Sequence, residues 1–166
     1  MLHMTDRPTG IAALDERIPF LLSQLGAYVA GEFQRRMSDI GVEPRTYAVL
    51  MALATEDGQS QRRLSARLGI HRNAMVTVVD ALEADGLVER MTHPDDRRAF
   101  AITLTAHARS LLPDLDRAGR ALEDTVTAPL SAVERSTLRE MLQRIAGGAG
   151  LIPGVHPDLA RGAVNG

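Results

Sequence analysis

Five neighbouring side chains near the middle of the chain stand at helical spacing and carry varied hydrogen-bonding or methyl groups. Arg72 can donate two parallel hydrogen bonds to a guanine or a phosphate, and Asn73 can pair with an adenine. The methyl groups of Val76 and Thr77 suit that of thymine, and His71 can donate to a phosphate. Together these residues predict contacts in the major groove of DNA, while an ordinary solvent-exposed helix face remains the alternative.

A charged turn further along the chain predicts a second contact with DNA. Residues two apart in a strand point to the same side, so Asp96 can pair with Arg98 and hold its direction. An oriented arginine at the tip of a hairpin fits a narrow minor groove, and Arg97 would then face a phosphate. The alternative is that residues 95–98 form only a solvated charged loop.

The elements that must position these groups predict a winged helix-turn-helix. A first helix begins at Ser60, a plausible N-cap that we also count among the candidate DNA contacts, and it ends at Gly69. The helix of residues 72–84 follows, and two strands at residues 87–91 and 99–104 form the wing. The apolar residues of the second helix recur at helical spacing and should dock on the core: Met75, Val78, Val79 and Leu82.

Four further helices are expected around this unit. The long helix of residues 14–40 tolerates Pro19 only near its start, and a second runs from residue 44 to about residue 55. Helices over residues 106–126 and about 132–146 open at the caps Thr105 and Ser131. The predicted fold class is mainly α with a small β-hairpin wing, about six helices and two to three short strands.

Composition narrows the class of protein. The 166 residues are 45% hydrophobic and 24% charged and contain no cysteine, so disulfides and thiolate metal sites are excluded. No secretory signal or membrane-length apolar run is visible, so we expect a cytoplasmic protein without a membrane partner. The net charge is -2, and all 19 basic residues are arginine. Any affinity for DNA therefore depends on local charge, should be moderate, and should fall strongly with salt.

Two motifs make the chain resemble the MarR family of winged helix-turn-helix transcriptional regulators. The family's wing pattern appears as His93-Pro94-Asp95-Asp96-Arg97-Arg98-Ala99, followed by Leu104-Thr105. The preceding run from Leu82 to Arg90 also matches, and the helical order extends the similarity over about residues 14–146. Two residues depart from the pattern. His93 replaces the usual first Asp of the turn, and His71 replaces the usual Ser, Thr or Asp cap and should leave the helix start less well capped.

The resemblance implies a homodimer that binds a near-palindromic double-stranded operator, as a repressor of a nearby operon. Residues 1–42 would be an arm and first dimerisation helix, 43–105 the DNA-binding domain, 106–146 the remaining dimerisation helices, and 147–166 a flexible tail rich in Gly and Pro. It also implies that Arg98, oriented by Asp96, enters the minor groove, and that Arg72, Asn73 and Thr77 lie on the recognition face.

Family members commonly release DNA when a small phenolic or aromatic acid binds between the dimer helices and the winged domain. Tyr28, Tyr47 and Met51 are the candidates to line such a cavity here, although each also fits the apolar stripe of an ordinary core. A ligand can weaken DNA binding only by preferring a conformation that DNA rejects.

Other classes of function have less support from the residues. A metal-responsive regulator is an alternative. However, no pair among the five histidines has the i, i+4 spacing of a helical metal site, so no metal or cofactor is expected. An enzyme is not expected, because the chain has no cysteine nucleophile or Gly-rich phosphate loop, and Asp95 and Asp96 lie beside arginines that keep carboxylates ionised. A dimeric interaction module that no longer binds DNA, or binds it without a ligand, stays open.

Overall fold

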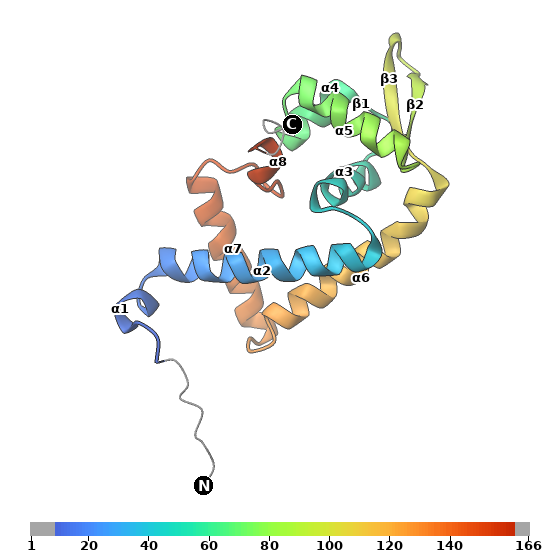
Figure 1. The fold of residues 1–166 in the computed structure, drawn as a ribbon. Coiled ribbons are helices and arrows are strands. Elements are labelled where there is room, and N and C mark those ends of the chain that lie inside the picture. The colour runs from blue at the N-terminus through green and yellow to red at the C-terminus, as the bar shows by residue number, and fades with distance from the viewer. Residues whose placement is uncertain (1–8, 162–166) are drawn as a thin grey trace.

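The computed structural model describes residues 9–161, which form eight helices and three strands (Figure 1). The helices are α1 (Ala12–Asp15), α2 (Ile18–Ile40), α3 (Pro44–Thr55), α4 (Gln61–Leu68), α5 (Arg72–Ala84), α6 (Ala106–Val126), α7 (Ala132–Gly148) and α8 (Asp158–Arg161). The strands are β1 (Gln59–Ser60), β2 (Val88–His93) and β3 (Asp96–Leu104). The expected fold class, mainly helical with a small β wing, is confirmed.

One hydrophobic core holds α3, α4, α5 and the sheet together. The elements α2 and α6 also contribute to it, through Met37, Ala108 and Leu115. Its deeply buried members from α3, α4, α5 and the sheet include Leu50, Leu53, Leu64, Met75, Val79, Leu82, Val88 and Ile102. The sheet has the strand order β1-β3-β2 and both pairings are antiparallel, with Gln59 opposite Ile102 and Val88 opposite Leu104. The apolar stripes of three short helices can be buried only by packing on one another, so this core fixes their mutual orientation.

Three long helices, α2, α6 and α7, form a frame beside this core. α2 lies along α6, and the guanidinium of Arg36 on α2 donates to the hydroxyl oxygen of Thr125 on α6 at 3.1 Å (Figure 1). α6 follows β3 directly, and Pro113 lies inside it without ending it. The helix-turn-helix and its wing are therefore joined to the frame by a helix that starts at the base of the wing.

The predicted helix caps are confirmed. Side-chain oxygens accept backbone N–H groups at Ser60, from Arg63 at 3.2 Å, and at Thr105, from Ala108 at 3.1 Å. Ser131 and Glu134 form a full capping box at the start of α7. Hydrogen bonds from the backbone and side chain of Ser131 lower the pKa of Glu134. These caps satisfy helix N–H groups that have no partner within the helix.

The structure corrects the first predicted helix and the strands. Residues 12–15 form the separate turn α1, and the long helix begins at Ile18, with Pro19 as its second residue. Pro19 has no N–H to donate to a preceding turn and its ring would collide with that turn's carbonyl, so a helix continuing through it from residue 14 would be destabilised, whereas Pro19 fits the first turn of a helix that begins at Ile18. The wing strands extend two or three residues beyond the prediction, and β1 adds a third strand.

In its described part, the tail of residues 147–166 is more ordered than the flexible segment that the sequence predicts. Its described part contains α8, and Leu159 of this helix is buried in the main core, with only 8% of its surface exposed. Gly and Pro residues mark turns here, but two apolar side chains, Val155 and Leu159, give the segment something to bury. Residues 162–166 lie outside the described part of the chain.

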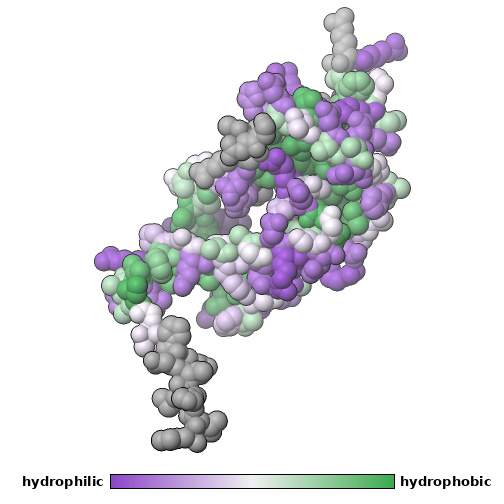
Figure 2. Space-filling view, in the orientation of Figure 1, coloured by the Kyte–Doolittle hydropathy of each residue, from purple (hydrophilic) through white to green (hydrophobic). Residues whose placement is uncertain are grey.

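Large apolar side chains remain exposed on α2 and α7. None of the residues of α7, all of which are described, is buried. The exposed apolar residues of the two helices are Ile18, Phe20, Leu22, Leu25, Tyr28, Val133, Leu138, Met141, Leu142 and Ile145. Figure 2 shows the molecule hollowed above the band that α2 forms across it, so this part of the frame is only partly filled by its own side chains. Among residues 9–161, no helix is long and apolar enough to cross a membrane.

The core packing predicts a sharp contrast between two adjacent residues of α5. Met75 is fully buried and Val76 is 42% exposed. Met75→Ala should lower the free energy of unfolding by about 2–5 kcal/mol, because it leaves a cavity, whereas Val76→Ala should change it by less than about 0.5 kcal/mol. Urea unfolding at a fixed protein concentration measures both. Equal losses would mean that α5 presents a different face to the core.

Candidate functional site

The exposed face of α5 carries the residues that the sequence singled out. The predicted inward stripe of Met75, Val78, Val79 and Leu82 is buried, as expected. Arg72, Asn73, Val76 and Thr77 are all exposed. Because the buried stripe fixes the rotation of the helix about its axis, these four side chains project together from its first two turns.

His71 caps α5, contrary to the expectation of a weaker helix start. Its Nδ1 atom accepts the backbone N–H of Asn73 at 3.4 Å, as the oxygen of a serine or aspartate would. His93, the other departure from the family pattern, does the same in the wing, where its Nδ1 accepts the N–H of Asp95 at 3.2 Å. A neutral ring that accepts at Nδ1 carries its proton on Nε2, so exposed His71 keeps a donor for phosphate.

Ser60 and two arginines stand at the beginning of α4. The Ser60 hydroxyl accepts the N–H of Arg63 and is half-buried, so its first role is structural. Arg63 pairs with Glu56 at 2.7 Å, while Arg62 is exposed. α4 lies next to α5 in the helix-turn-helix, so the start of α4 and the exposed face of α5 belong to one structural unit (Figure 1).

The wing extends away from the helices as a two-stranded hairpin (Figure 1). Arg97 is exposed near its tip, where the pairing shifts register between Thr92 and His93. The side chains of Asp96 and Arg98 lie outside the described part of the structure, so their ion pair stays a prediction. The backbone of both residues belongs to β3, at the position that the sequence assigned to the wing.

Arg90 connects the wing to α5, a role that was not predicted from the sequence. From β2 its guanidinium pairs with the carboxylates of Asp80 and Glu83 on α5. Its backbone N–H also donates to Glu83, at 3.3 Å. Burial disfavours the charged form of Arg90, but hydrogen bonds to the two carboxylates outweigh it and raise its pKa. The spacing of Asp80 and Glu83 on one helix face was the signal in the sequence for a shared partner.

A cavity of about 950 Å³ lies beside the winged unit. Its walls come from α2, α3, α4 and the tail. Tyr47 and Met51 line it, but Tyr28 does not and is half-exposed elsewhere on α2. The rings of Phe33 and Tyr47 meet edge to face in its wall, with centroids 5.1 Å apart. Burial, and then the charge of Asp116, raise the pKa of Tyr47, so its phenol stays neutral.

The charged groups of the cavity are two arginines and one aspartate. Arg45, Arg67 and Asp158 line it, among mainly apolar neighbours. Arg67 is partly engaged already, since it donates to the carbonyl oxygen of Ala52 at 3.1 Å and lies 3.8 Å from Glu56. The combination of aromatic walls with guanidinium groups suits a ligand that has an aromatic ring and an anionic group.

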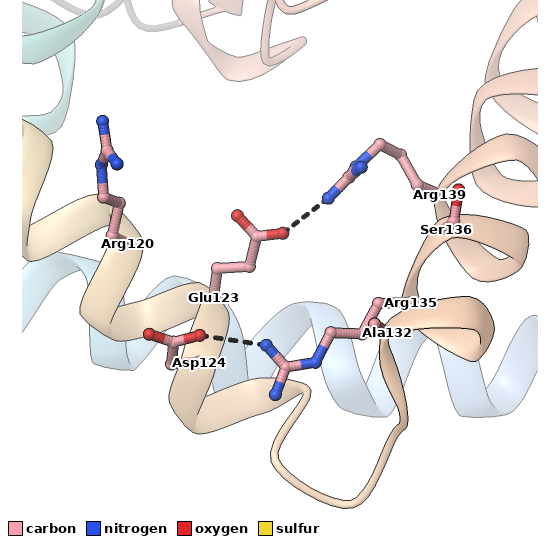
Figure 3. Close-up of a pocket in the computed structure, with 7 residues that line it drawn as sticks. All are labelled: Arg120, Glu123, Asp124, Ala132, Arg135, Ser136 and Arg139. Carbon is pink, nitrogen blue, oxygen red and sulfur yellow. Dashed lines mark hydrogen bonds and ion pairs between the residues drawn. The ribbon is translucent and has the colours of Figure 1, made fainter.

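A smaller hollow of about 400 Å³ between α6 and α7 has a different character (Figure 3). Arg135 pairs with Asp124 at 3.0 Å, and Arg139 pairs with Glu123 at 2.8 Å. Arg120, which also lines it, pairs with Asp116 at 2.9 Å. Since each arginine already faces a carboxylate, we interpret this hollow as the joint that holds α7 on α6. Within residues 9–161, no group of His, Cys, Asp or Glu side chains could hold a metal ion.

Comparison with known proteins gives a consistent family. The model of the MarR family matches residues 40–99. A putative transcriptional regulatory protein for the hcr operon of Thauera aromatica is 34% identical over 105 residues, which cover 63% of this chain and 63% of that protein. A MarR-family transcriptional regulator from Rhodococcus sp. RHA1 is 30% identical, with a TM-score of 0.66 over 84% of this chain and 96% of that one.

The repressor CouR is similar in two solved states. CouR from Rhodococcus jostii RHA1 bound to p-coumaroyl-CoA is 32% identical, with a TM-score of 0.69 over 82% of this chain and 96% of that one. CouR bound to a 23-mer DNA duplex is 30% identical, with a TM-score of 0.68 over 84% and 99% of the two chains. The winged helix-turn-helix, the helical frame and these relatives together show that the chain belongs to the MarR family of transcriptional regulators.

Proposed function

We propose that the chain is a homodimeric repressor that binds a near-palindromic operator and releases it when an aromatic anion occupies the cavity. The observation that carries the proposal is the set of exposed side chains that α5 presents beside the wing. Arg72, Asn73, Val76 and Thr77 read base edges in the major groove, with His71, Ser60 and Arg97 on phosphates. Arg98, directed by Asp96, enters the minor groove.

Dimerisation explains the exposed apolar faces of the frame. Helices in proteins gain most of their stability from burying an apolar face against other elements. In a single chain, α7 buries none of its residues. A second copy that packs against α2 and α7 would cover side chains such as Leu25 and Leu142. Residues 1–42 and 106–146 then form the dimerisation region around the DNA-binding unit of residues 43–105.

The effector proposal rests on the chemistry of the cavity. It has room for an aromatic acyl group between Phe33, Tyr47 and Met51, and arginine lies within the same wall. CouR, which is similar over most of this chain, binds p-coumaroyl-CoA. The shared chemistry is an aromatic acyl group with a negative charge, supplied by a free acid or by a coenzyme A thioester.

Two substitutions distinguish readers of sequence from contacts with the DNA backbone and groove. Asn73→Ala should change the sequence preference, with a cost of about 1–3 kcal/mol on the best site. Arg98→Ala should weaken binding to all sequences and lower the salt slope by roughly one for each cationic group removed from the DNA, since fewer counterions are released. Selection from a random DNA pool and polarisation titrations at several salt concentrations measure the two effects.

Arg117→Ala is the charge-matched control, because Arg117 is exposed on α6 and pairs with Asp114 away from the wing. It should leave both readouts unchanged. An Asn73 variant that selects the parental sequence would remove that residue from the readers. An Arg98 variant with the parental affinity and slope would overturn the assignment of the wing.

The dimer is tested by placing a charge on the apolar face of α7. Leu142→Asp should give a monomer and reduce DNA affinity at least about tenfold, because an interfacial carboxylate has no partner and a monomer presents only one winged unit to the DNA. Gln143→Asp adds the same charge one residue away, on the polar face, and should remain dimeric. Light scattering gives the mass of each variant. A dimeric Leu142→Asp protein would exclude this face as the interface.

The effector site is tested with p-coumarate, p-coumaroyl-CoA and coenzyme A. At least one of the aromatic probes should bind and weaken DNA binding, whereas coenzyme A alone should do neither. Arg45→Met should reduce the affinity for that probe about tenfold or more, since it removes a charge-assisted hydrogen bond. Arg117→Met is the control, and calorimetry measures the affinities. Parental affinity in Arg45→Met, or no binding by either aromatic probe, would contradict the proposed site.

A further inference from the structure

Residues 152–160, which we call the strap, fold back from the end of α7 onto the winged unit. Its first turn is Ile152-Pro153-Gly154-Val155, in which the N–H of Val155 donates to the carbonyl oxygen of Ile152 at 3.1 Å. Gly154 has a φ of +71°, and a proline followed by a glycine with positive φ is typical of a type II turn. Nδ1 of His156 then accepts the N–H of Asp158 at 3.2 Å and opens α8. The strap is thus a locally ordered element.

The strap contacts the turn of the helix-turn-helix itself. Gly69 ends α4 with a φ of +64°, and α5 begins three residues later, at Arg72. A Cβ atom added at Gly69 would lie only 3.1 Å from Cδ1 of Ile152, so this side chain packs against the backbone of the turn. Figure 1 shows the chain crossing from the end of α7 to the side of α4, where α8 lies.

The same segment forms one wall of the cavity. Pro153, Gly154, Val155 and His156 line it from the strap, opposite residues of α2 and α3. Leu159 anchors this wall, because its side chain is buried in the core of the winged unit. An occupant of the cavity would therefore contact the strap, and the strap contacts the turn that joins α4 to α5.

We propose that the strap couples the cavity to the DNA-binding helices, with Ile152 on Gly69 as the contact that transmits the position of one to the other. With the cavity empty, the strap holds the helix-turn-helix in a defined orientation relative to α7 and so reduces the entropy lost on binding DNA. The regulatory half of this inference rests on the proposed effector function: a ligand that displaces the strap changes that orientation.

The experiment uses the full chain and three variants. Ile152→Ala removes the contact with Gly69 at a side chain that is 47% exposed, so the protein should still fold. Leu159→Ser loosens the anchor, and Leu151→Ala is the matched control on a neighbour that is 44% exposed. Each protein is titrated with DNA alone and with DNA in the presence of p-coumarate or p-coumaroyl-CoA, and calorimetry gives the affinity for the probe.

Ile152→Ala should raise the Kd for DNA without ligand severalfold, within the roughly 2- to 30-fold range of such couplings. It should also reduce the factor by which the probe weakens DNA binding, while the affinity for the probe stays within about twofold of the parental value. Leu159→Ser should raise the Kd as well, and Leu151→Ala should match the parent. If Ile152→Ala also matches the parent in its Kd for DNA, the inference is overturned, whatever happens to probe binding.

Failure of the effector proposal gives a different result. If neither probe alters DNA binding by the parental protein, that proposal fails, and the strap is judged by its ligand-free effects alone. Ile152→Ala should then still raise the Kd for DNA and speed amide exchange at Ile70, whose N–H donates to the backbone carbonyl of Ser65 in α4. A parental Kd for DNA would overturn the strap's role in this case too, and parental exchange at Ile70 would exclude the contact with Gly69 as its route.

Discussion

The burial of one apolar stripe of α5 is the constraint that determines which of its side chains point outward. Met75, Val78, Val79 and Leu82 fill the space between α4, the sheet and α3, and this packing sets the rotation of the helix about its axis. No contact of the exposed side chains is needed to direct them outward. Arg90 adds a second restraint, because its pairs with Asp80 and Glu83 tie the base of the wing to the same helix. Arg90 therefore joins α5 to the wing.

The frame has the opposite balance of burial and exposure. α2 and α7 carry large apolar side chains that a single chain leaves exposed, whereas the winged unit is packed around a core to which α2, α6 and α8 add Met37, Leu115 and Leu159. A helix such as α7 that buries nothing gains little stability alone. The proposed dimer therefore supplies a core as well as a second reading face. The cavity and the strap lie between these two parts, where we propose that a ligand alters their relative orientation.

Much of the architecture could be read from the chain, because local chemistry fixes helix ends. Ser60, Thr105 and Ser131 provide oxygens for free N–H groups, and Gly41 and Gly69 adopt the left-handed conformation that ends a helix. The exposed face of α5 followed from periodicity alone. The hydrogen bonds that His71 accepts at the start of α5 and His93 accepts in the wing turn were missed. An imidazole nitrogen can replace a serine or aspartate oxygen only in one tautomer and one rotamer. Local patterns do not report that choice.

By itself, the sequence determined the family, the order of the helices, their caps and the identity of the outward residues of α5, since each depends on neighbours a few positions away. Tertiary structure alone decided that Tyr47 and Met51 share a cavity while Tyr28 does not, and that Arg90 bridges two carboxylates. It also decided that the tail, read as irregular, buries Leu159 and reaches Gly69. These contacts join residues far apart in the chain, and the apolar surface that favours them exists only once the core has formed.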